Sequence, residues 1–219
     1  SASVVARRAQ APVELDLVYR ERVQVAETRI AGAEVIDRDG EWAVVSEGDS
    51  HRLYVRLSEE AQLDRLGIPA AQNVLRLNAV QNVELHGLEV IGSSTWGQGF
   101  QVSGSSDVLI DRCIAHHNVN NGFLLRDSSN VTLRRSLATA NYNGVMTYGL
   151  TDSLIASNDI GANNGDGLLV TWGSQNVTVR RNYVHHQILW GHPDNLQMYE
   201  GNEGIRFVEN FCLAAGQTM

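Results

Sequence analysis

The stretch DVLIDRCIAHHN, which begins at Asp107, decides the fold of this chain because its pattern is repeated. The other copies are NVELHGLEVIG from Asn82, NVTLRRSLATAN from Asn130, DSLIASNDIGAN from Asp152, NVTVRRNYVHHQ from Asn176 and EGIRFVENFCLAAG from Glu203. The starts at 82, 107, 130, 152 and 176 lie 25, 23, 22 and 24 residues apart. A period in the low twenties, made of short apolar runs with no helical pattern between them, is typical of a stacked solenoid.

The first run of each copy alternates between two faces, as Val108 and Ile110 do against Leu109 and Asp111. Such alternation is the period of a strand with one buried face. A turn residue, a second short apolar run, a Gly/Asn-rich corner and an apolar quartet complete the copy. Three strands and three corners per turn describe an all-β fold, a right-handed parallel β-helix of short strands with about six rungs over residues 73–219. A leucine-rich repeat shares this period, but its fixed leucine ladder is not found here.

The quartets predict which residues of each rung point inward, since a slip of one residue would exchange the two faces. The residues expected in the core are Phe100, Phe123, Val145, Leu168 and Leu196. Those expected on the outer surface are Gln101, Leu124, Met146, Leu169 and Gln197, followed two residues later by Ser103, Arg126, Tyr148, Thr171 and Tyr199. The residues just before the quartets should form one ladder of Gln98, Asn121, Asn143, Asp166 and Asp194. At the second corner, Asn158, Asn182 and Asn210 predict an asparagine ladder.

Residues 1–72 do not follow the repeat, and we expect them to form an N-terminal cap with irregular first turns. A β-helix must cover its end, since an open rung presents unpaired backbone and bare core. The chain stops at CLAAGQTM, where another quartet would begin. We therefore expect a C-terminal end that is truncated or completed by a partner chain or oligomer, with Ile205, Phe207 and Phe211 as core residues of the open rung.

Composition excludes several classes of function. All 17 basic residues are arginine, so no mechanism can use a lysine of this chain. A net charge of -8 disfavours nucleic acid as a partner, and no apolar run is long enough to cross a membrane. Cys113 and Cys212 should lie about four rungs apart, well beyond the roughly 7 Å that a disulfide allows between Cα atoms.

Two further pairs of residues repeat along the chain. Arg134–Arg135 and Arg180–Arg181 fall on the second strand of their rungs and are expected to form surface ion pairs or a basic stripe for an acidic glycan. His116–His117 and His185–His186 occupy one slot and are expected two rungs apart, about 9.6 Å, which is too far for a shared metal ion.

The outer face of the quartet strands is the expected binding surface, because solenoids use such a face as an elongated groove. Its aromatic and polar side chains suit a sugar chain, whose apolar faces stack on rings. The substrate-binding candidates are Gln197, Tyr199, Trp190 and Trp172.

The fifth turn contains the best candidate site. Its corner lengthens to QILWGHPD, and an insertion in a repeat protein usually lies on the binding face. The insertion should bring Trp190, His192 and Asp194 to the edge of the groove. Asp166 lies one rung below Asp194, so the two carboxylates should be about 5 Å apart and one pKa should be raised, as an acid paired with a base or nucleophile requires. The alternative is that Asp166 only forms a turn within NNGDG.

From Asn73 onward the repeats resemble those of the pectate-lyase-like superfamily of right-handed β-helices. The stretch GHPDNLQMYEG is similar to a His-Pro-Asp-x-x-Gln signature in bacterial β-helix proteins related to alginate epimerases and lyases. The resemblance implies an enzyme, secreted or at the bacterial cell surface, that acts on a uronate-containing polysaccharide. It implies no certain cofactor, although calcium bound by Asp166 and Asp194 is an option.

The same resemblance implies roles for individual residues. His192 would be the base or acid, and Asp194 its orienter or a calcium ligand. Tyr148 or Tyr199 would be the second proton carrier, and Arg126 would neutralise the substrate carboxylate. The chain departs from the family pattern because the Asp-Pro-His motif of the epimerases and the lysine of several lyases are absent.

Three functions therefore compete. A lyase or C5-epimerase needs a proton shuttle and an arginine. A glycoside hydrolase would use Asp166 and Asp194 at a set separation, about 5–5.5 Å for retention or 6.5–9.5 Å for inversion. A non-catalytic carbohydrate-binding or tail-spike-like β-helix would need only the ring-lined groove and stable stacking.

Overall fold

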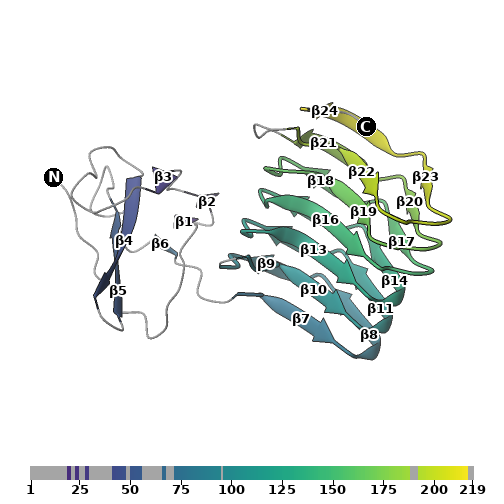
Figure 1. The fold of residues 1–219 in the computed structure, drawn as a ribbon, viewed down its shortest axis with the longest axis horizontal. Helices are drawn as coiled ribbons and strands as arrows, with labels where there is room; N and C mark the ends of the chain where they lie inside the picture. The colour runs from purple at the N-terminus through teal and green to yellow at the C-terminus, as the bar shows by residue number, and fades with distance from the viewer. Residues whose placement is uncertain are drawn as a thin grey trace.

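The structure, a computed structural model, describes residues 72–94, 96–187 and 192–216 in full, together with the backbone of six short strands before them. From residue 75 the chain forms a parallel β-helix of six rungs, each contributing one strand to each of three six-stranded sheets (Figure 1). Within the described ranges there are only strands, turns and loops, and none of these elements is a helix long and apolar enough to cross a membrane.

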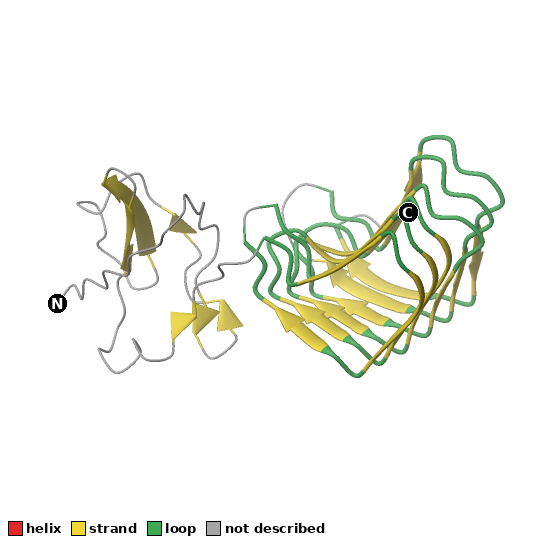
Figure 2. Ribbon diagram, turned by 90° about the horizontal axis from the view of Figure 1, so that it is seen from below, coloured by secondary structure: helices red, strands yellow, loops and turns green. Residues whose placement is uncertain are grey.

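The three parallel sheets carry the expected quartet strands, the first runs and the second runs. The quartet sheet contains β7 Leu75–Asn78, β10 Phe100–Ser103, β13 Asn121–Arg126, β16 Asn143–Tyr148, β19 Leu168–Thr171 and β22 Leu196–Tyr199. The second sheet contains β8 Gln81–His86, β11 Ser106–Asp111, β14 Ser129–Arg134, β17 Leu154–Ala156, β20 Thr178–Arg180 and β23 Arg206–Val208. The third sheet contains β9 Glu89–Ile91, β12 Ile114–His116, β15 Leu137–Thr139, β18 Asp159–Gly161, β21 Tyr183–Gln187 and β24 Phe211–Ala215. Figure 2 shows the strands stacked rung upon rung, with loops joining the sheets.

The strands before residue 72 form two small sheets of their own. One joins β1 Tyr19–Arg20 to β2 Val23–Gln24 and β6 Leu66–Gly67, and the other joins β3 Thr28–Arg29, β4 Glu41–Glu47 and β5 Ser50–Val55. Strands β4 and β5 pair antiparallel over six residue pairs. The capping role of residues 1–72 stays a prediction.

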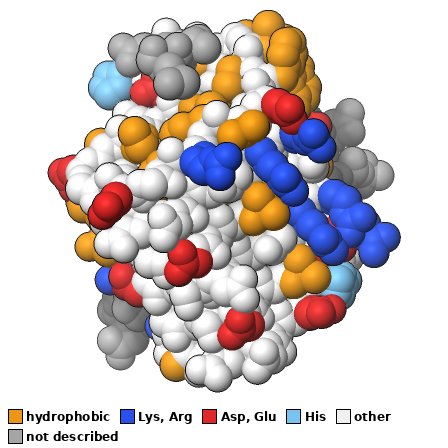
Figure 3. Space-filling model, turned by 90° about the vertical axis from the view of Figure 1, so that its right-hand side faces the viewer, with side chains coloured by type: hydrophobic (Ala, Val, Ile, Leu, Met, Phe, Trp, Pro, Cys, Tyr) orange, Lys and Arg blue, Asp and Glu red, His pale blue; other side chains and the backbone are white. Residues whose placement is uncertain are grey.

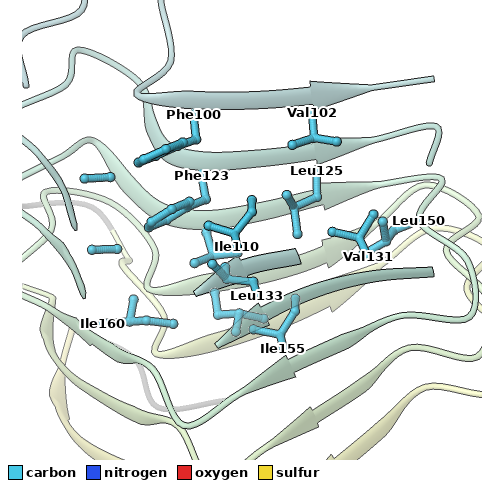
Figure 4. Packing of buried hydrophobic residues seen from close by; sticks show 14 of the residues in the cluster. Phe100, Val102, Ile110, Phe123, Leu125, Val131, Leu133, Leu150, Ile155 and Ile160 are labelled. Carbon is cyan, nitrogen blue, oxygen red and sulfur yellow. The ribbon is translucent and has the colours of Figure 1, made fainter. Parts of the chain in front are cut away.

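The predicted register is confirmed in the core. Phe100 stacks on Phe123 with ring centroids 4.9 Å apart and ring planes within 8° (Figure 4). By register, Val145, Leu168 and Leu196 continue the same ladder. All five are at most 5% exposed. Inward residues of the second sheet, such as Ile110 and Leu133, meet them across the interior.

The corners are held by ladders of polar side chains that run along the stack. At the second corner, Asn182 accepts the backbone N–H of Asn158 at 3.0 Å and donates its own amide to the Ile155 carbonyl at 3.0 Å. Asn210 does the same for Asn182, so the predicted asparagine ladder is confirmed. Each ladder amide therefore satisfies backbone groups that the turn leaves without a strand partner.

The Asn or Asp that opens each copy has a conformational reason. Asp107, Asn130, Asp152 and Asn176 all have φ between 48° and 56°. Asn and Asp tolerate this left-handed region better than other side chains because they hydrogen-bond locally. Backbone geometry thus explains why Asn or Asp occupies this position of the repeat.

Four expectations need correction. Thr171 is fully buried, because its hydroxyl turns to donate to the Thr147 carbonyl at 2.6 Å. Leu169 takes its outward place between Met146 and Gln197 but is only 4% exposed. Phe211 is an outer residue, 61% exposed and stacked on Tyr183, because Cys212 takes the inward slot beside Val184. The two histidine pairs lie three rungs apart, not two, because Thr139 and Gly161 stand between them in the register.

The cysteine prediction is confirmed, since Cys113 and Cys212 are both free. Ile205 and Phe207 pack against the core as partly buried residues, as predicted. A partner at the last rung stays a prediction.

Candidate active site

The residues before the quartets form the predicted ladder. The backbone N–H of Asn121 donates to the Gln98 side chain at 3.0 Å, and the side-chain amide of Asn143 donates to the Asn121 side chain at 3.0 Å. The backbone N–H of Asp166 donates to the Asn143 side chain at 2.9 Å. The ladder therefore continues unbroken as its members change from amides to carboxylates.

Asp166 uses one carboxylate oxygen to continue this ladder, accepting the backbone N–H of Asp194 at 2.8 Å. Burial raises the pKa of Asp166 most, and the negative charge of Asp194 adds to that effect. The backbone hydrogen bond from Asp194 and the charge of His192 act in the opposite direction. The corner thus holds a carboxyl group with a raised affinity for a proton next to a second carboxylate.

Asp194 is 6% exposed, and its carboxylate accepts a hydrogen bond from the Gln197 amide at 3.1 Å. His192 stands two residues earlier, is exposed, and makes no hydrogen bond to the described part of the chain. The structure therefore brings Asp194, Gln197, Asp166 and His192 together at one corner of the quartet sheet. Trp190 lies outside the described residues, as does most of the lengthened corner that contains it.

An aromatic row runs along the coil at the opposite edge of the same sheet, at the C-terminal ends of the quartet strands. Trp172 lies between Tyr148 and Tyr199, with ring centroids 5.0 Å and 5.2 Å away. Burial raises the pKa of the Tyr199 hydroxyl, and the charges of Glu200 and Asp166 raise it further. The three rings lie on three successive rungs, which are roughly 4.8 Å apart, and together they form one aromatic platform.

Trp172 occupies its place at the cost of backbone strain. Its φ is 42°, in the left-handed region, whereas Gly149 holds the corresponding turn one rung below with φ 56°. An L residue with a side chain pays about 1–2 kcal/mol for this conformation. The equivalent residues Asp127 and Glu200 have φ of 46° and 64°, so the left-handed turn belongs to this corner of the repeat and the indole is carried on it.

Arg126 lies at the other end of the aromatic row. Its guanidinium carbon is 5.0 Å from the centre of the Tyr148 ring, and its Nε donates to Asp127 at 2.8 Å. Strand β13, which carries Arg126, is three strands from β22, which carries Gln197, so about 14 Å separate the two rungs. Arg126 therefore joins Tyr148 but does not reach the His192 corner.

Asn195 marks the corner as unusual. The four rungs directly before it have glycine at its position, because a Cβ atom on Gly122 would lie 2.8 Å from the Asn141 amide and 2.9 Å from the Gly144 carbonyl. Asn195 is fully buried, and neither its amide nitrogen nor its amide oxygen has a hydrogen-bond partner among the described residues. Such an orphaned amide beside Asp194 costs stability, typically about 1–3 kcal/mol.

Calcium binding by Asp166 and Asp194 stays a prediction, and it would need further ligands. Calcium takes six to eight oxygen ligands. One oxygen of Asp166 is bonded to the Asp194 backbone and one of Asp194 to Gln197, which leaves two carboxylate oxygens. Among the described residues no three His, Cys, Asp or Glu side chains converge as metal ligands would.

A family comparison fits this architecture. The sequence model of the right-handed beta helix region matches residues 73–209. The chain belongs to this β-helix family. The match covers all but the last strand of the described coil and fixes its hand as right-handed.

Solved structures resemble this β-helix in fold. The periplasmic alginate epimerase AlgG aligns with 66% of this chain and 43% of its own, with 16% identity and a TM-score of 0.51. A mutant of AlgG aligns with 67% and 42%, with 16% identity and a TM-score of 0.50. The chain thus spans less than half the length of AlgG. No curated protein matches the chain by sequence.

One feature of this β-helix was not foreseen from its sequence. His185 donates from Nε2 to Asp159 at 2.8 Å, and its Nδ1 lies 2.8 Å from Nδ1 of His186. Glu89, His116 and His117 repeat the arrangement: Nε2 of His116 lies 2.9 Å from the Glu89 carboxylate, and its Nδ1 lies 2.7 Å from Nδ1 of His117. Burial lowers the pKa of His117 to about 4. The only sequence signal was an acidic residue two positions earlier in the rung below. Both relays lie on the third sheet, away from the quartet face.

Proposed function

We propose that this β-helix modifies a uronate-containing polysaccharide by removing the proton at C5, as a C5-epimerase or a lyase. The observation that carries the proposal is that the aromatic row Tyr148–Trp172–Tyr199 and a titratable corner belong to one sheet. The row lies at the C-terminal ends of the quartet strands, the corner of His192, Asp166 and Asp194 lies at their N-terminal ends, and Gln197 of β22 stands between them. A ring platform alone would bind sugars, and a titratable corner alone would do general chemistry. Their presence on one sheet favours chemistry on a bound sugar chain.

The row supplies binding and orientation. Pyranose rings present apolar C–H faces that stack on aromatic rings, while their hydroxyls remain hydrogen-bonded at the rim. Three ring-bearing rungs match a few successive sugar units, with Arg126 beside Tyr148 available to a carboxylate at the far end of that segment.

The corner supplies the proton chemistry. His192 is exposed and unpaired among the described residues, so its ring can accept the C5 proton. Burial raises the pKa of the Tyr199 hydroxyl, so that hydroxyl carries its proton and can return it to the other face of the sugar. The Gln197 amide can donate a hydrogen bond to the substrate carboxylate, whose charge grows as C5 loses its proton.

Both reactions begin with the same step and then diverge. After the C5 proton leaves, the electron pair is delocalised into the C6 carboxylate. Return of a proton to the other face of C5 gives the epimer, whereas loss of the oxygen at C4 gives an unsaturated sugar. This sequence has no lysine to assist either step.

We infer a secreted or periplasmic location from the same substrate class, since such polymers lie outside the cytoplasm. The likeness to a periplasmic alginate epimerase supports this inference at the level of fold.

The test is turnover by matched histidine variants. Polymannuronate, polyguluronate and polygalacturonate are incubated with the protein, and products are followed by ultraviolet absorbance of the unsaturated sugar and by proton NMR. His192→Ala should lower turnover by about 10²–10⁴-fold, as loss of a general base does, with little change in binding. His86→Ala removes an equally exposed histidine of the second sheet and should leave turnover unchanged. Full activity in His192→Ala would refute the assignment.

A glycoside hydrolase is the second candidate, favoured by the raised pKa of Asp166 beside Asp194. In that case new reducing ends appear without ultraviolet absorbance, and Asp166→Asn loses activity together with Asp194→Asn. A protein that binds these chains and converts none of them would instead be a carbohydrate-binding β-helix.

A further inference from the structure

A band of arginine gathers on a different face from the candidate site. Figure 3 shows basic side chains crossing one side of the coil, where the second sheet lies. Eight arginines lie between residues 72 and 216, and six of them belong to this band: Arg112, Arg134, Arg135, Arg180, Arg181 and Arg206. The band is basic although the net charge of the chain is -8.

The register explains why the band is continuous. Arg134 and Arg180 share one outward position two rungs apart, and Arg206 stands two residues earlier on the last rung. Arg112, Arg135 and Arg181 follow at the next turn with φ of 54°, 50° and 53°. The left-handed backbone directs these side chains out at the sheet edge, so the arginines run parallel to the coil axis.

Part of this charge is held by internal ion pairs. Asp111, 1% exposed, accepts hydrogen bonds from Arg135, with 2.7 Å between Arg135 Nε and Oδ1, and from Arg134 at 3.4 Å. The Arg135 guanidinium lowers the pKa of Asp111 to about 2, so this carboxylate stays ionised. Arg181 pairs with Glu209 at 2.6 Å. With Asp111 and Glu209 set against six arginines, the band keeps four positive charges (6 − 2).

Arg180 and Arg206 remain available for a ligand. Both are exposed, and neither makes an ion pair or hydrogen bond to another described residue. They line an open depression of about 520 Å³ with Thr178, Asn176 and Asp152. Asn176 is already bonded to Asp152 at 3.0 Å, which ties the one acidic group of the depression to a neutral partner.

The chemistry of the depression selects an anionic sugar chain. Each guanidinium offers a planar fork that matches a carboxylate, while Thr178 and Asn176 suit sugar hydroxyls. No aromatic residue lines the depression, so bases of a single-stranded nucleic acid would find no stacking partner.

We propose that the second sheet carries an accessory site, centred on Arg180 and Arg206, that binds a uronate chain along the coil axis. The choice of uronate among polyanions rests on the proposed function of the quartet face. The site holds polymer against the protein independently of the aromatic row, so long chains benefit from two contacts and short oligomers do not.

The experiment compares arginine variants of the full chain. Binding of a fluorescent mannuronate oligomer is measured by anisotropy at low and moderate salt in the Trp172→Ala background, where the aromatic row is impaired. Adding Arg180→Gln and Arg206→Gln should weaken the remaining binding by about tenfold or more and reduce its salt dependence, because two charged contacts are lost. Arg181→Gln is the matched control, and it should change affinity less than about twofold since Arg181 is already paired with Glu209.

Two results would overturn the accessory site: unchanged binding in the Arg180→Gln/Arg206→Gln variant, or tighter binding of polyphosphate or single-stranded DNA than of a uronate oligomer with the same charge. In the wild-type background the double variant should lose turnover on polymer and keep it on short oligomers. If no uronate is converted by the wild-type protein while arginine-dependent binding persists, the proposed function fails and the accessory site stands.

Discussion

Removing the indole of Trp172 tests the central part of the candidate site, and two substitutions separate its ring from its backbone. Trp172→Ala and Trp172→Gly both delete the contacts to Tyr148 and Tyr199. Only glycine adopts φ near 42° without steric cost. The two variants therefore share the loss of the ring and differ in the strain.

The magnitudes follow from the structure. Each aromatic contact contributes about 0.5–1.5 kcal/mol, so either variant should lose about 1–3 kcal/mol of unfolding free energy through the ring. The alanine variant keeps the left-handed strain, and it should be about 1 kcal/mol less stable than the glycine variant. The affinity for sugar should fall by about tenfold in both variants, because loss of one stacking ring costs about 1.4 kcal/mol of binding free energy.

Guanidinium denaturation followed by circular dichroism measures the stabilities, and titration with uronate oligomers measures the affinities. Equal stability of the alanine and glycine variants would refute the strain argument. Wild-type affinity in both variants would remove Trp172 from the binding surface, and with it the reason to place a sugar on the aromatic row.

Three further predictions concern the coil itself. Gly144→Ala should lower the free energy of unfolding by more than about 3 kcal/mol, because its Cβ would lie 2.5 Å from the Gly167 carbonyl oxygen. Gly104→Ala meets only open space at φ 55° and should lower it by about 1 kcal/mol. Equal losses of the two variants in urea denaturation would contradict this. Asn182→Ala should cost about 1–3 kcal/mol by leaving backbone groups of two rungs unpaired. Thermal unfolding measures this loss against the half-buried Asn164→Ala, whose side chain makes no ladder bond. The pKa of Asp111 is lowered to about 2 in the folded state, so its stabilising ion pairs are present above pH 4 and are lost as pH falls towards 2. Asp111→Asn should therefore flatten the dependence of unfolding free energy on pH in that window. An acid transition unchanged from wild type would be the contrary result.

Much of the fold could be predicted because the repeat leaves few alternatives. Once strands alternate, only two registers exist for each, and Phe100 with Phe123 selects one of them. The Asn ladder followed from the same spacing, since equivalent positions on successive rungs must meet.

The errors arose where a rung departs from its neighbours. Thr171 stands in register with Tyr148 and Tyr199, but its hydroxyl turns to the Thr147 carbonyl and buries the side chain, and no alternation rule contains that hydrogen bond. Phe211 was placed inside on hydrophobicity, although Cys212 holds the inward slot. Arg126 shares the outer face of the quartet sheet with the fifth-turn corner, but three strand spacings between β13 and β22 separate it from His192.

The candidate site was only partly predictable for a related reason. The ladder position of Asp166 and Asp194 followed from the period, but the hydrogen bonds that occupy one oxygen of each did not. The carboxylate–histidine relays were missed because each joins a residue to the rung below, where the acidic partner is 26 or 27 positions away.

The most direct measurement of the central claim is exchange of the C5 proton. Polymannuronate is incubated with the protein in deuterium oxide, and proton NMR follows the C5 signal, which reports proton removal for an epimerase and a lyase alike. The account predicts loss of the C5 signal with the wild-type protein and its retention with His192→Ala. Retention of the C5 proton with wild-type protein across polymannuronate, polyguluronate and polygalacturonate would contradict it.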